Sequence, residues 1–233
     1  MNIPAPLLIV ARRLGALRPR AVFVGGMIRG LLITDPGAAP ERPTDDVDVI
    51  VQLTAREEFY RLNEELRRLG FREDSSEGAP VCRWVVEGVL VDVMPTEGSI
   101  LGFSNDWYPA AHAHAFEVTA DGESLRVVSA PYFCATKLEA FADRGKGDLY
   151  HHDLEDVLAV IDGRAELHAE LVSSEDDVRE YVSTRVAELL AMPAFLEALP
   201  GHLPGDEASQ ARLPLVEQRL RTIASLATSQ QVR

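Results

Sequence analysis

The pattern of hydrophobic and polar positions divides the chain into two regions of different character. Up to about residue 130, short apolar runs rich in β-branched residues are separated by glycine, proline and polar residues, which is typical of strands. Gly88 and the pair Asp121-Gly122 each interrupt such a run and predict β-hairpins. Thr54 and Glu57 have the spacing of a helix capping box. The predicted strands cover residues 21–24, 47–53, 81–87, 89–94, 116–119 and 125–129, with helices at 6–17, 27–33 and 54–69.

From Pro131 onward the pattern becomes helical. Apolar residues recur at intervals of three and four, as they do on one face of a helix, and Pro131 suits a first helical turn. The predicted helices cover residues 131–144, 153–162, 175–191 and 208–227. We therefore expect an α+β protein. A mixed β-sheet with flanking helices would form domain 1–130, and a helical C-terminal domain would cover residues 131–233.

Composition and charge exclude several classes of protein. The 233 residues are 46% hydrophobic and 26% charged, which is ordinary for a globular chain. The net charge of −14 argues against a broad, non-specific binder of nucleic acid, because affinity for phosphate backbones comes mainly from Lys and Arg. The two cysteines form no CxxC motif, so a structural zinc site is not expected. No apolar run is long enough to span a bilayer and no signal peptide is evident, so we expect a cytoplasmic protein without a membrane partner.

Three aspartates interrupt or open apolar strands. Asp46 and Asp48 are two positions apart at the start of one strand, so their side chains project from the same face. Asp92 lies within the apolar run 89–94, where a charge must be paired, solvated or bound to metal. If the two strands are neighbours, three carboxylates meet at one place, which suits Mg²⁺ or Mn²⁺ chemistry. An acidic strand entrance in water is the alternative for the DxD sequence alone.

A pair of glycines, Gly25-Gly26, lies between a predicted buried strand and a predicted helix. Glycine lets the backbone approach a phosphate closely. An ordinary strand-to-helix turn is the alternative. The chain has neither a P-loop nor a GxGxxG sequence, so an ATPase or a dinucleotide-binding protein lacks support.

Together, these features resemble the DNA polymerase β-like nucleotidyltransferase superfamily. The segment Val24-Gly25-Gly26-Met27-Ile28-Arg29-Gly30-Leu31-Leu32 is similar to the start of the CCA-adding enzymes and of the AbiEii-type toxins. The resemblance implies the nucleotidyltransferase fold, with the glycine pair at the triphosphate. It implies that Asp46 and Asp48 bind metal and that Asp92 completes the metal site and serves as the base. Many family members have Gly-Ser where this chain has Gly25-Gly26.

The helical region adds a second resemblance. Residues 129–157 are similar to the AbiEii/AbiGii-type nucleotidyltransferases, in which a helix with a lysine precedes a basic turn and a DLxD-like helix. The resemblance implies that Lys137 faces the nucleotide phosphates and that Asp153, or Asp156, supports the site. Lys137 and Arg144 are seven positions apart and share a helical face. A surface lysine is the alternative for Lys137. The resemblance covers residues 20–162, and the tail from 163 onward has no functional match.

The candidate nucleotide-binding residues are Gly25, Gly26, Arg29, Thr44, Lys137, Arg144 and Asp153. The predicted activity is metal-dependent transfer of an NMP from an NTP to an acceptor, either RNA (such as a tRNA end) or a protein side chain. The resemblance implies a toxin-like role, in a toxin–antitoxin system or phage defence, with a cognate antitoxin as partner. The alternatives are an aminoglycoside-type enzyme, which the low pI favours because an acidic cleft attracts cations, and a non-catalytic nucleotide-binding relative.

Basic residues near the N-terminus suggest how an acidic protein could meet RNA. Before the first acidic residue, Asp35, the charged side chains are all arginines. We expect a local positive rim around the acidic site, and RNA modification that falls with salt. The residues expected in this rim are Arg12, Arg13, Arg18, Arg29, Arg42, Arg144 and Lys146.

Overall fold

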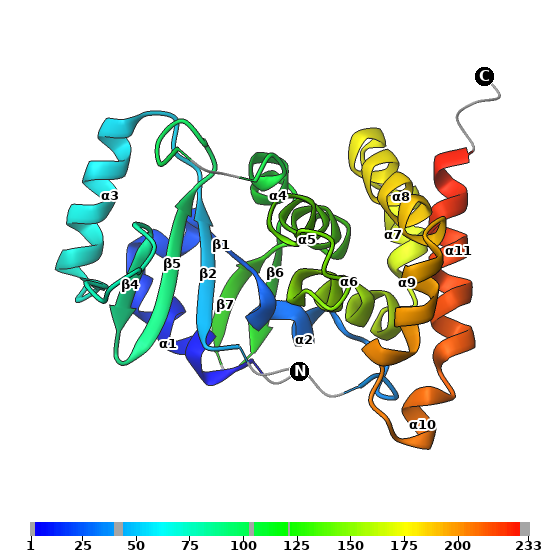
Figure 1. Cartoon of the computed structure of the whole chain (residues 1–233). Coiled ribbons are helices and arrows are strands. Elements are labelled where there is room, and N and C mark those ends of the chain that lie inside the picture. Colours follow the sequence, from blue (N-terminus) through cyan, green and yellow to red (C-terminus); the bar gives the residue numbers. More distant parts are fainter. Residues whose placement is uncertain (1–2, 40–43, 103–104, 121, 229–233) are drawn as a thin grey trace. The chain divides into compact units, whose positions relative to one another are not determined.

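A mixed β-sheet of seven strands organises the first part of the chain (Figure 1). The computed structural model describes residues 3–39, 44–102, 105–120 and 122–228. The strands follow the order β3-β4-β5-β2-β1-β7-β6. β5 is parallel to β2 and β7 is parallel to β1, whereas the other neighbouring strands are antiparallel. The strand bounds are Ala21–Val24 (β1), Asp46–Val51 (β2), Arg72–Glu73 (β3), Arg83–Val86 (β4), Val89–Pro95 (β5), Phe116–Ala120 (β6) and Glu123–Val127 (β7).

The burial of β2 changes along its length. Val47 and Val49 are fully buried, whereas Asp46 and Asp48 on the opposite face are only partly buried. From Ile50 onward both faces are covered. The β-branched residues therefore hold the strand in the core, and its first half leaves one face accessible to polar groups.

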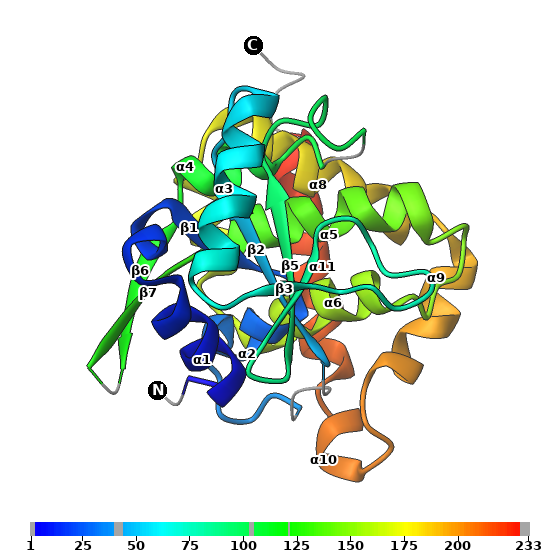
Figure 2. The same ribbon diagram turned by 90° about the vertical axis from the view of Figure 1, so that its left-hand side faces the viewer.

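Helices flank the sheet in the first of two compact units, Met1–Leu31 with Arg42–Ser129. The apolar face of α1 packs against β2, β5 and β7 through its buried leucines, valine and alanine. α1 and α3 can be followed in Figure 2. The helical elements that begin in this unit are Ala5–Leu14 (α1), Arg29–Leu32 (α2), Arg56–Arg68 (α3) and Tyr108–Ala113 (α4), with 3-10 turns at Gly15–Arg20 and Gly26–Ile28.

The second unit, Leu32–Glu41 with Ala130–Arg233, is helical. α5 packs against α6 and α8, and α11 packs along α8. Its core includes Phe133, Leu171, Val182, Phe195 and Leu220, all fully buried. The helix bounds are Ala130–Arg144 (α5), His152–Gly163 (α6), Leu167–Val172 (α7), Asp176–Leu190 (α8), Pro193–Ala198 (α9), Glu207–Gln210 (α10) and Leu213–Thr228 (α11), with a 3-10 turn at Leu199–His202.

A short segment before β2 belongs to this second unit. The backbone N–H groups of Thr34 and Asp35 both donate to the carbonyl of Gly163 at 2.9 Å. Arg164 donates to the carbonyl of Leu32 at 2.6 Å, and Arg212 donates to Asp35 at 2.7 Å. Buried or half-buried hydrogen bonds of this kind hold a loop segment onto helices far away in sequence.

The structure confirms the predicted α+β class, with a mixed sheet and flanking helices. Both predicted hairpins form, as β4–β5 and β6–β7. The first helix ends at Leu14, earlier than predicted, and Gly15 follows with a φ of 52°. The capping prediction at Thr54 is wrong by one residue: the backbone N–H and hydroxyl of Thr54 donate to Glu58, at 2.7 and 3.0 Å.

Candidate active site

Asp46 and Asp48 project from one face of β2, and Asp92 lies beside them on β5. In the parallel β2–β5 pair, Asp48 is opposite Asp92 and Asp46 is opposite Leu90. Directly paired residues on neighbouring strands share a face of the sheet. All three carboxylates therefore lie on the same face, where β2 and β5 run side by side in Figure 1. Asp92 is the most buried of the three, since Asp46 and Asp48 are only partly buried.

Gly25 lies directly against the Asp48 carboxylate. β1 pairs Val24 with Asp48, and Gly25 follows with a φ of +74°, which L side chains rarely adopt. A Cβ built on Gly25 would lie 1.8 Å from Asp48 Oδ2, well inside van der Waals contact. Only glycine can occupy this position without moving Asp48. At the end of β1, the backbone of Gly25 therefore lies next to the Asp48 carboxylate with no side chain between them.

Arg83 on β4 joins this group, although the sequence analysis gave it no role. It lies opposite Asp92 in the hairpin. Its Nε donates to Asp92 Oδ1 at 2.8 Å, and its Nη2 donates to Asp92 Oδ2 at 2.7 Å and to Asp46 Oδ2 at 2.8 Å. The hydrogen bonds to Asp92 raise the pKa of Arg83 further above its ordinary value. The guanidinium is therefore a permanent positive charge among the acidic groups.

The hairpin predicted from the sequence is sufficient to place Arg83 opposite Asp92. A turn at Glu87-Gly88 pairs Val86 with Val89, and each step away from the turn pairs the next two residues. Three steps further, Arg83 faces Asp92. A cross-strand pair of opposite charges is favourable, and the register followed from the position of Gly88.

The chemistry of the three aspartates suits a divalent cation. Carboxylate oxygens on one face, one of them beside a backbone without a side chain, are the ligands that Mg²⁺ takes together with substrate phosphates. Asp46, Asp48 and Asp92 are thus the residues that would hold Mg²⁺ or Mn²⁺. Arg83 currently takes both oxygens of Asp92 and one of Asp46.

A second cluster offers metal-ligand atoms in the helical unit. In the described part of the chain, one atom each of His151, His152 and Asp153 lie within 4.8 Å of one another. The carboxylate of Asp153 already accepts hydrogen bonds from Lys137 and Arg144, whose positive charges oppose a dication. His151 Nδ1 accepts the backbone N–H of Asp153 at 3.3 Å and so caps α6. These contacts make the cluster a helix cap rather than a metal centre.

The remaining predicted residues of the first unit lie close to β1 in sequence. Gly26 begins the 3-10 turn after Gly25. Arg29, at the start of α2, is only 4% exposed, so its charge is inside the protein rather than at the surface. The Thr44 hydroxyl contacts the sulfur of Met27 at 3.6 Å. Thr44 and Met27 thereby link the residues preceding β2 with the turn that follows the glycines.

Lys137, Arg144 and Asp153 form a buried ionic network in the helical unit. The Lys137 ammonium lies 3.0 Å from Asp153 Oδ1 and 2.7 Å from Asp156 Oδ2. Arg144 donates to both oxygens of Asp153, at 2.7 and 2.9 Å. Lys137 is therefore not a surface lysine, and that alternative is wrong. Two basic and two acidic groups join α5 to α6 with no net charge.

The pKa of Asp153 reflects this network. Burial by itself would raise it, but the hydrogen bonds of Arg144 and the charge of Lys137 outweigh burial and lower the pKa to about 2. Asp153 is completely buried, and both cations favour its ionised form. The neighbouring His152 has its pKa lowered by burial.

The structure changes the expectation of a positive rim at the N-terminal arginines, because three of them form ion pairs. Arg12 and Arg18 both bind Glu123, and Arg13 binds Glu87. These ion pairs offset two of the three positive charges. Arg29 is buried, and Arg42 lies outside the described residues. The N-terminal arginines therefore attract RNA less strongly than the sequence indicates.

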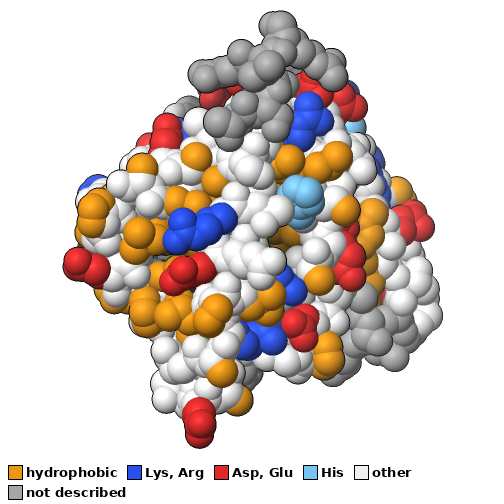
Figure 3. All heavy atoms as spheres, turned by 90° about the vertical axis from the view of Figure 1, so that its right-hand side faces the viewer, with side chains coloured by type: hydrophobic (Ala, Val, Ile, Leu, Met, Phe, Trp, Pro, Cys, Tyr) orange, Lys and Arg blue, Asp and Glu red, His pale blue; other side chains and the backbone are white. Residues whose placement is uncertain are grey.

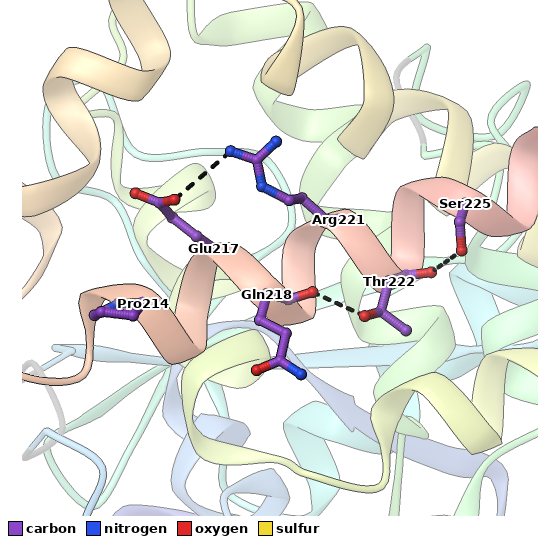
Figure 4. A pocket seen from close by; sticks show the side chains of 6 residues that line it. All are labelled: Pro214, Glu217, Gln218, Arg221, Thr222 and Ser225. Atoms are coloured by element: carbon purple, nitrogen blue, oxygen red, sulfur yellow. Dashed lines mark hydrogen bonds and ion pairs between the residues drawn. The ribbon is translucent and has the colours of Figure 1, made fainter.

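Surface hollows are found on the helical unit. One of them follows α11, where its side chains pair with others on the same helix (Figure 4). Glu217 lies 3.6 Å from Arg221, and the hydroxyls of Thr222 and Ser225 donate to backbone carbonyls of α11 at 2.8 and 2.7 Å. On the face that carries α8 and α11, apolar, basic and acidic side chains are interspersed (Figure 3). A hollow lined by one helix lacks the convergent groups of an active site.

Comparison with known proteins establishes the class of the chain. The sequence model described as "Nucleotidyl transferase AbiEii toxin, Type IV TA system" matches residues 8–226. The protein is a nucleotidyltransferase. It belongs to the AbiEii toxin family. The predicted resemblance and enzyme class are confirmed, and the match extends through the tail from 163 onward, for which the sequence analysis found no functional match.

Two further comparisons and a search for membrane helices complete the findings. No curated protein is significantly similar to the chain. Among solved structures, it is similar to an antigenic nucleotidyltransferase-like protein from Paracoccidioides brasiliensis. The identity is 18%, the match covers 76% of this chain and 91% of that chain, and the TM-score is 0.48. Within the described ranges, every helix is too short or too polar to cross a bilayer.

Proposed function

We propose that the protein transfers a nucleoside monophosphate from an NTP to an acceptor hydroxyl, in a reaction that requires Mg²⁺ or Mn²⁺ held by Asp46, Asp48 and Asp92. The pairing of Asp48 with Asp92 on parallel strands, beside the bare backbone of Gly25, supports this proposal most directly. A bound divalent cation supplies charge neutralisation at the oxygens that attack and leave.

The chain's own groups have separate tasks in this proposal. The backbone at Gly25 and Gly26 lies close to the triphosphate, since no side chain intervenes at Gly25. The acceptor oxygen bonds to the phosphorus of the NMP unit, and the bond to pyrophosphate breaks. Asp92 takes the proton of the acceptor hydroxyl. In the structure, each oxygen of Asp92 accepts a hydrogen bond from Arg83.

The helical region contributes the other proposed nucleotide-binding residues. Lys137, Arg144 and Asp153 act as one network, since Asp153 accepts from both cations. Arg144 is the exposed member, with 56% of its side chain accessible, and is therefore the group of this network that a phosphate can reach. Lys137 positions Asp153 and Asp156.

For the acceptor we propose RNA, a tRNA end in particular, as the first substrate to test, with a protein side chain as the second. Membership of a toxin family supports a macromolecular acceptor and a cognate antitoxin. An aminoglycoside acceptor and a non-catalytic nucleotide-binding role are the outcomes that the same experiment can reveal.

The experiment offers each α-labelled NTP separately, together with total RNA, with cell protein or with aminoglycosides, in Mg²⁺, in Mn²⁺ and with a chelator. We expect label on RNA that depends on the metal. Label on protein or on an aminoglycoside alone would replace the acceptor and leave the transfer activity intact. Nucleotide binding without label on any acceptor would overturn the proposed transfer.

A further inference from the structure

Arg83 occupies the same carboxylate oxygens that the proposed metal site would use. It takes both oxygens of Asp92, at 2.8 and 2.7 Å, and Oδ2 of Asp46, at 2.8 Å. Asp92 is on the strand next to Arg83, and Asp46 is one strand further. One guanidinium thus spans three strands and connects two of the three acidic groups.

The backbone fixes where this arginine can reach. Arg83 is held opposite Asp92 by the hairpin register, so its side chain starts on the face that carries the carboxylates. Its planar fork matches the two oxygens of Asp92, a geometry that an ammonium group could not reproduce. The contact is therefore a specific one and not an accidental approach of a long side chain.

The electrostatics explain why a cation is needed there at all. Asp46, Asp48 and Asp92 lie on one face, and carboxylates at such spacing repel each other unless positive charge lies between them. Arg83 supplies one positive charge. A divalent cation would supply two at the same oxygens, and the guanidinium and the cation would repel each other there.

We propose that Arg83 is an exchangeable internal cation: it holds Asp46 and Asp92 together in the metal-free protein, and divalent metal binds only when its guanidinium leaves them. The inference rests on the proposed function, since it takes the three aspartates as the metal ligands. The side chain of Arg83 is 21% exposed and that of Asp46 is 36% exposed, so the guanidinium has solvent to move into.

The test measures metal binding rather than transfer. Isothermal titration of Mn²⁺ into the full-length protein, without nucleotide, compares the wild type with Arg83→Gln, Arg83→Lys and the control Arg72→Gln, an exposed arginine of β3 in the same sheet. We expect Arg83→Gln to bind Mn²⁺ about ten-fold more tightly or better, equal to about 1.4 kcal/mol. Arg72→Gln should stay within about three-fold of the wild type, since it retains Arg83. Arg83→Lys should fall between the wild type and Arg83→Gln, since it keeps the charge but loses the planar fork.

Thermal unfolding gives a second readout. Without metal, Arg83→Gln should melt below the wild type, because its carboxylates repel each other, and Mn²⁺ should raise its Tm by more. Equal Mn²⁺ affinity in wild type and Arg83→Gln, or weaker affinity in the variant, would overturn the role of Arg83 and leave the metal site standing. Tight binding that survives Asp48→Asn in the Arg83→Gln background would overturn both, since the metal would then bind elsewhere.

The wild type alone also provides a test, should Arg83→Gln fail to fold. The Nε–H of Arg83 donates to Asp92 and gives an NMR signal of its own. This signal should shift during a Mg²⁺ titration with the same apparent Kd that calorimetry gives. An Nε–H signal that stays unchanged at saturating Mg²⁺ would show that the arginine does not leave. No Mg²⁺ or Mn²⁺ binding in any variant, together with no label transfer, would instead refute the proposed function.

Discussion

Gly25 and Asp48 lie in direct contact where β1 and β2 pair, so closely that a Cβ on Gly25 would be 1.8 Å from Asp48 Oδ2. Gly25→Ala should therefore push the carboxylate out of place and abolish transfer. The φ of +74° with a ψ of −171° at Gly25 lies in a region that essentially only glycine adopts, so alanine there adds about 1–3 kcal/mol of backbone strain. Label transfer, Mn²⁺ affinity and the free energy of unfolding measure the three consequences separately.

Gly70 offers a matched control for that substitution. It has a φ of +89°, and a Cβ there would have no described atom within 4 Å. Gly70→Ala should also lose stability from backbone strain, but it should keep its transfer activity and metal affinity. If Gly25→Ala and Gly70→Ala transferred nucleotide equally well, the contact with Asp48 would have no part in the activity.

Lys137→Ala should destabilise the protein strongly. The substitution leaves Asp153 and Asp156, both completely buried, without the ammonium that lies 3.0 and 2.7 Å from them. Breaking a buried ion pair costs about 3–5 kcal/mol. A surface lysine, which was the alternative for Lys137 in the sequence analysis, would show no such loss. Urea unfolding measures the loss.

The other lysine of the chain, Lys146, is exposed and provides the control. Lys146→Ala should change the free energy of unfolding by no more than about 0.5 kcal/mol. Lys137→Arg keeps the charge, so it should fold and allow nucleotide affinity to be measured apart from stability. A Lys137→Ala protein as stable as Lys146→Ala would contradict the network.

Asp153 should make stability depend on pH in the acid range. Its pKa is lowered from 3.8 to about 2 in the folded protein. A lowered folded-state pKa gives stabilisation that is present above the unfolded value and is lost as the pH falls from about 4 towards 2. A shift of roughly two units corresponds to about 2–3 kcal/mol. Urea unfolding of the wild type at several pH values in this window measures the loss.

A ¹³C NMR titration of the Asp153 carboxyl measures the same pKa directly. Arg144→Gln removes two of its hydrogen bonds, so the pKa should rise. The loss of stability between pH 4 and 2 should then be smaller than in the wild type. An Asp153 that titrates at or above 3.8 in the wild type would contradict the structure of the network.

The sequence predicted the strands and hairpins well because residues close together in the chain determine these elements. Gly88 interrupts an apolar run, and the hairpin that it predicts sets the register of β4 against β5. The i, i+2 spacing of Asp46 and Asp48 places them on one face whatever the rest of the chain does. The parallel pairing of β2 with β5, which the sequence analysis stated as a condition, depends on packing between segments that are distant in sequence.

The parts that could not be predicted depend on distant or very short segments. Nothing near residues 32–38 indicates that Arg164 and Arg212 bind this segment to the helical unit. The helices α4, α7 and α9 have six residues each, too few for a clear helical period. The arginines near the N-terminus formed a basic run in the sequence, but three of them form ion pairs with Glu123 of β7 and with Glu87 in the turn between β4 and β5.

The assignment of Asp48 as a metal-binding residue of the transfer site is the central claim, and a single comparison tests it most directly. Asp48→Asn removes one charge at the site, and Asp45→Asn removes one charge from an exposed aspartate just before β2. Both proteins are checked for folding by thermal unfolding and then given labelled NTP, Mg²⁺ and the acceptor that the wild type labels. The account predicts wild-type transfer by Asp45→Asn and at least about 100-fold less by Asp48→Asn, the order of loss seen when an enzyme loses an electrostatic contact to its transition state. Full transfer by a correctly folded Asp48→Asn protein would contradict it.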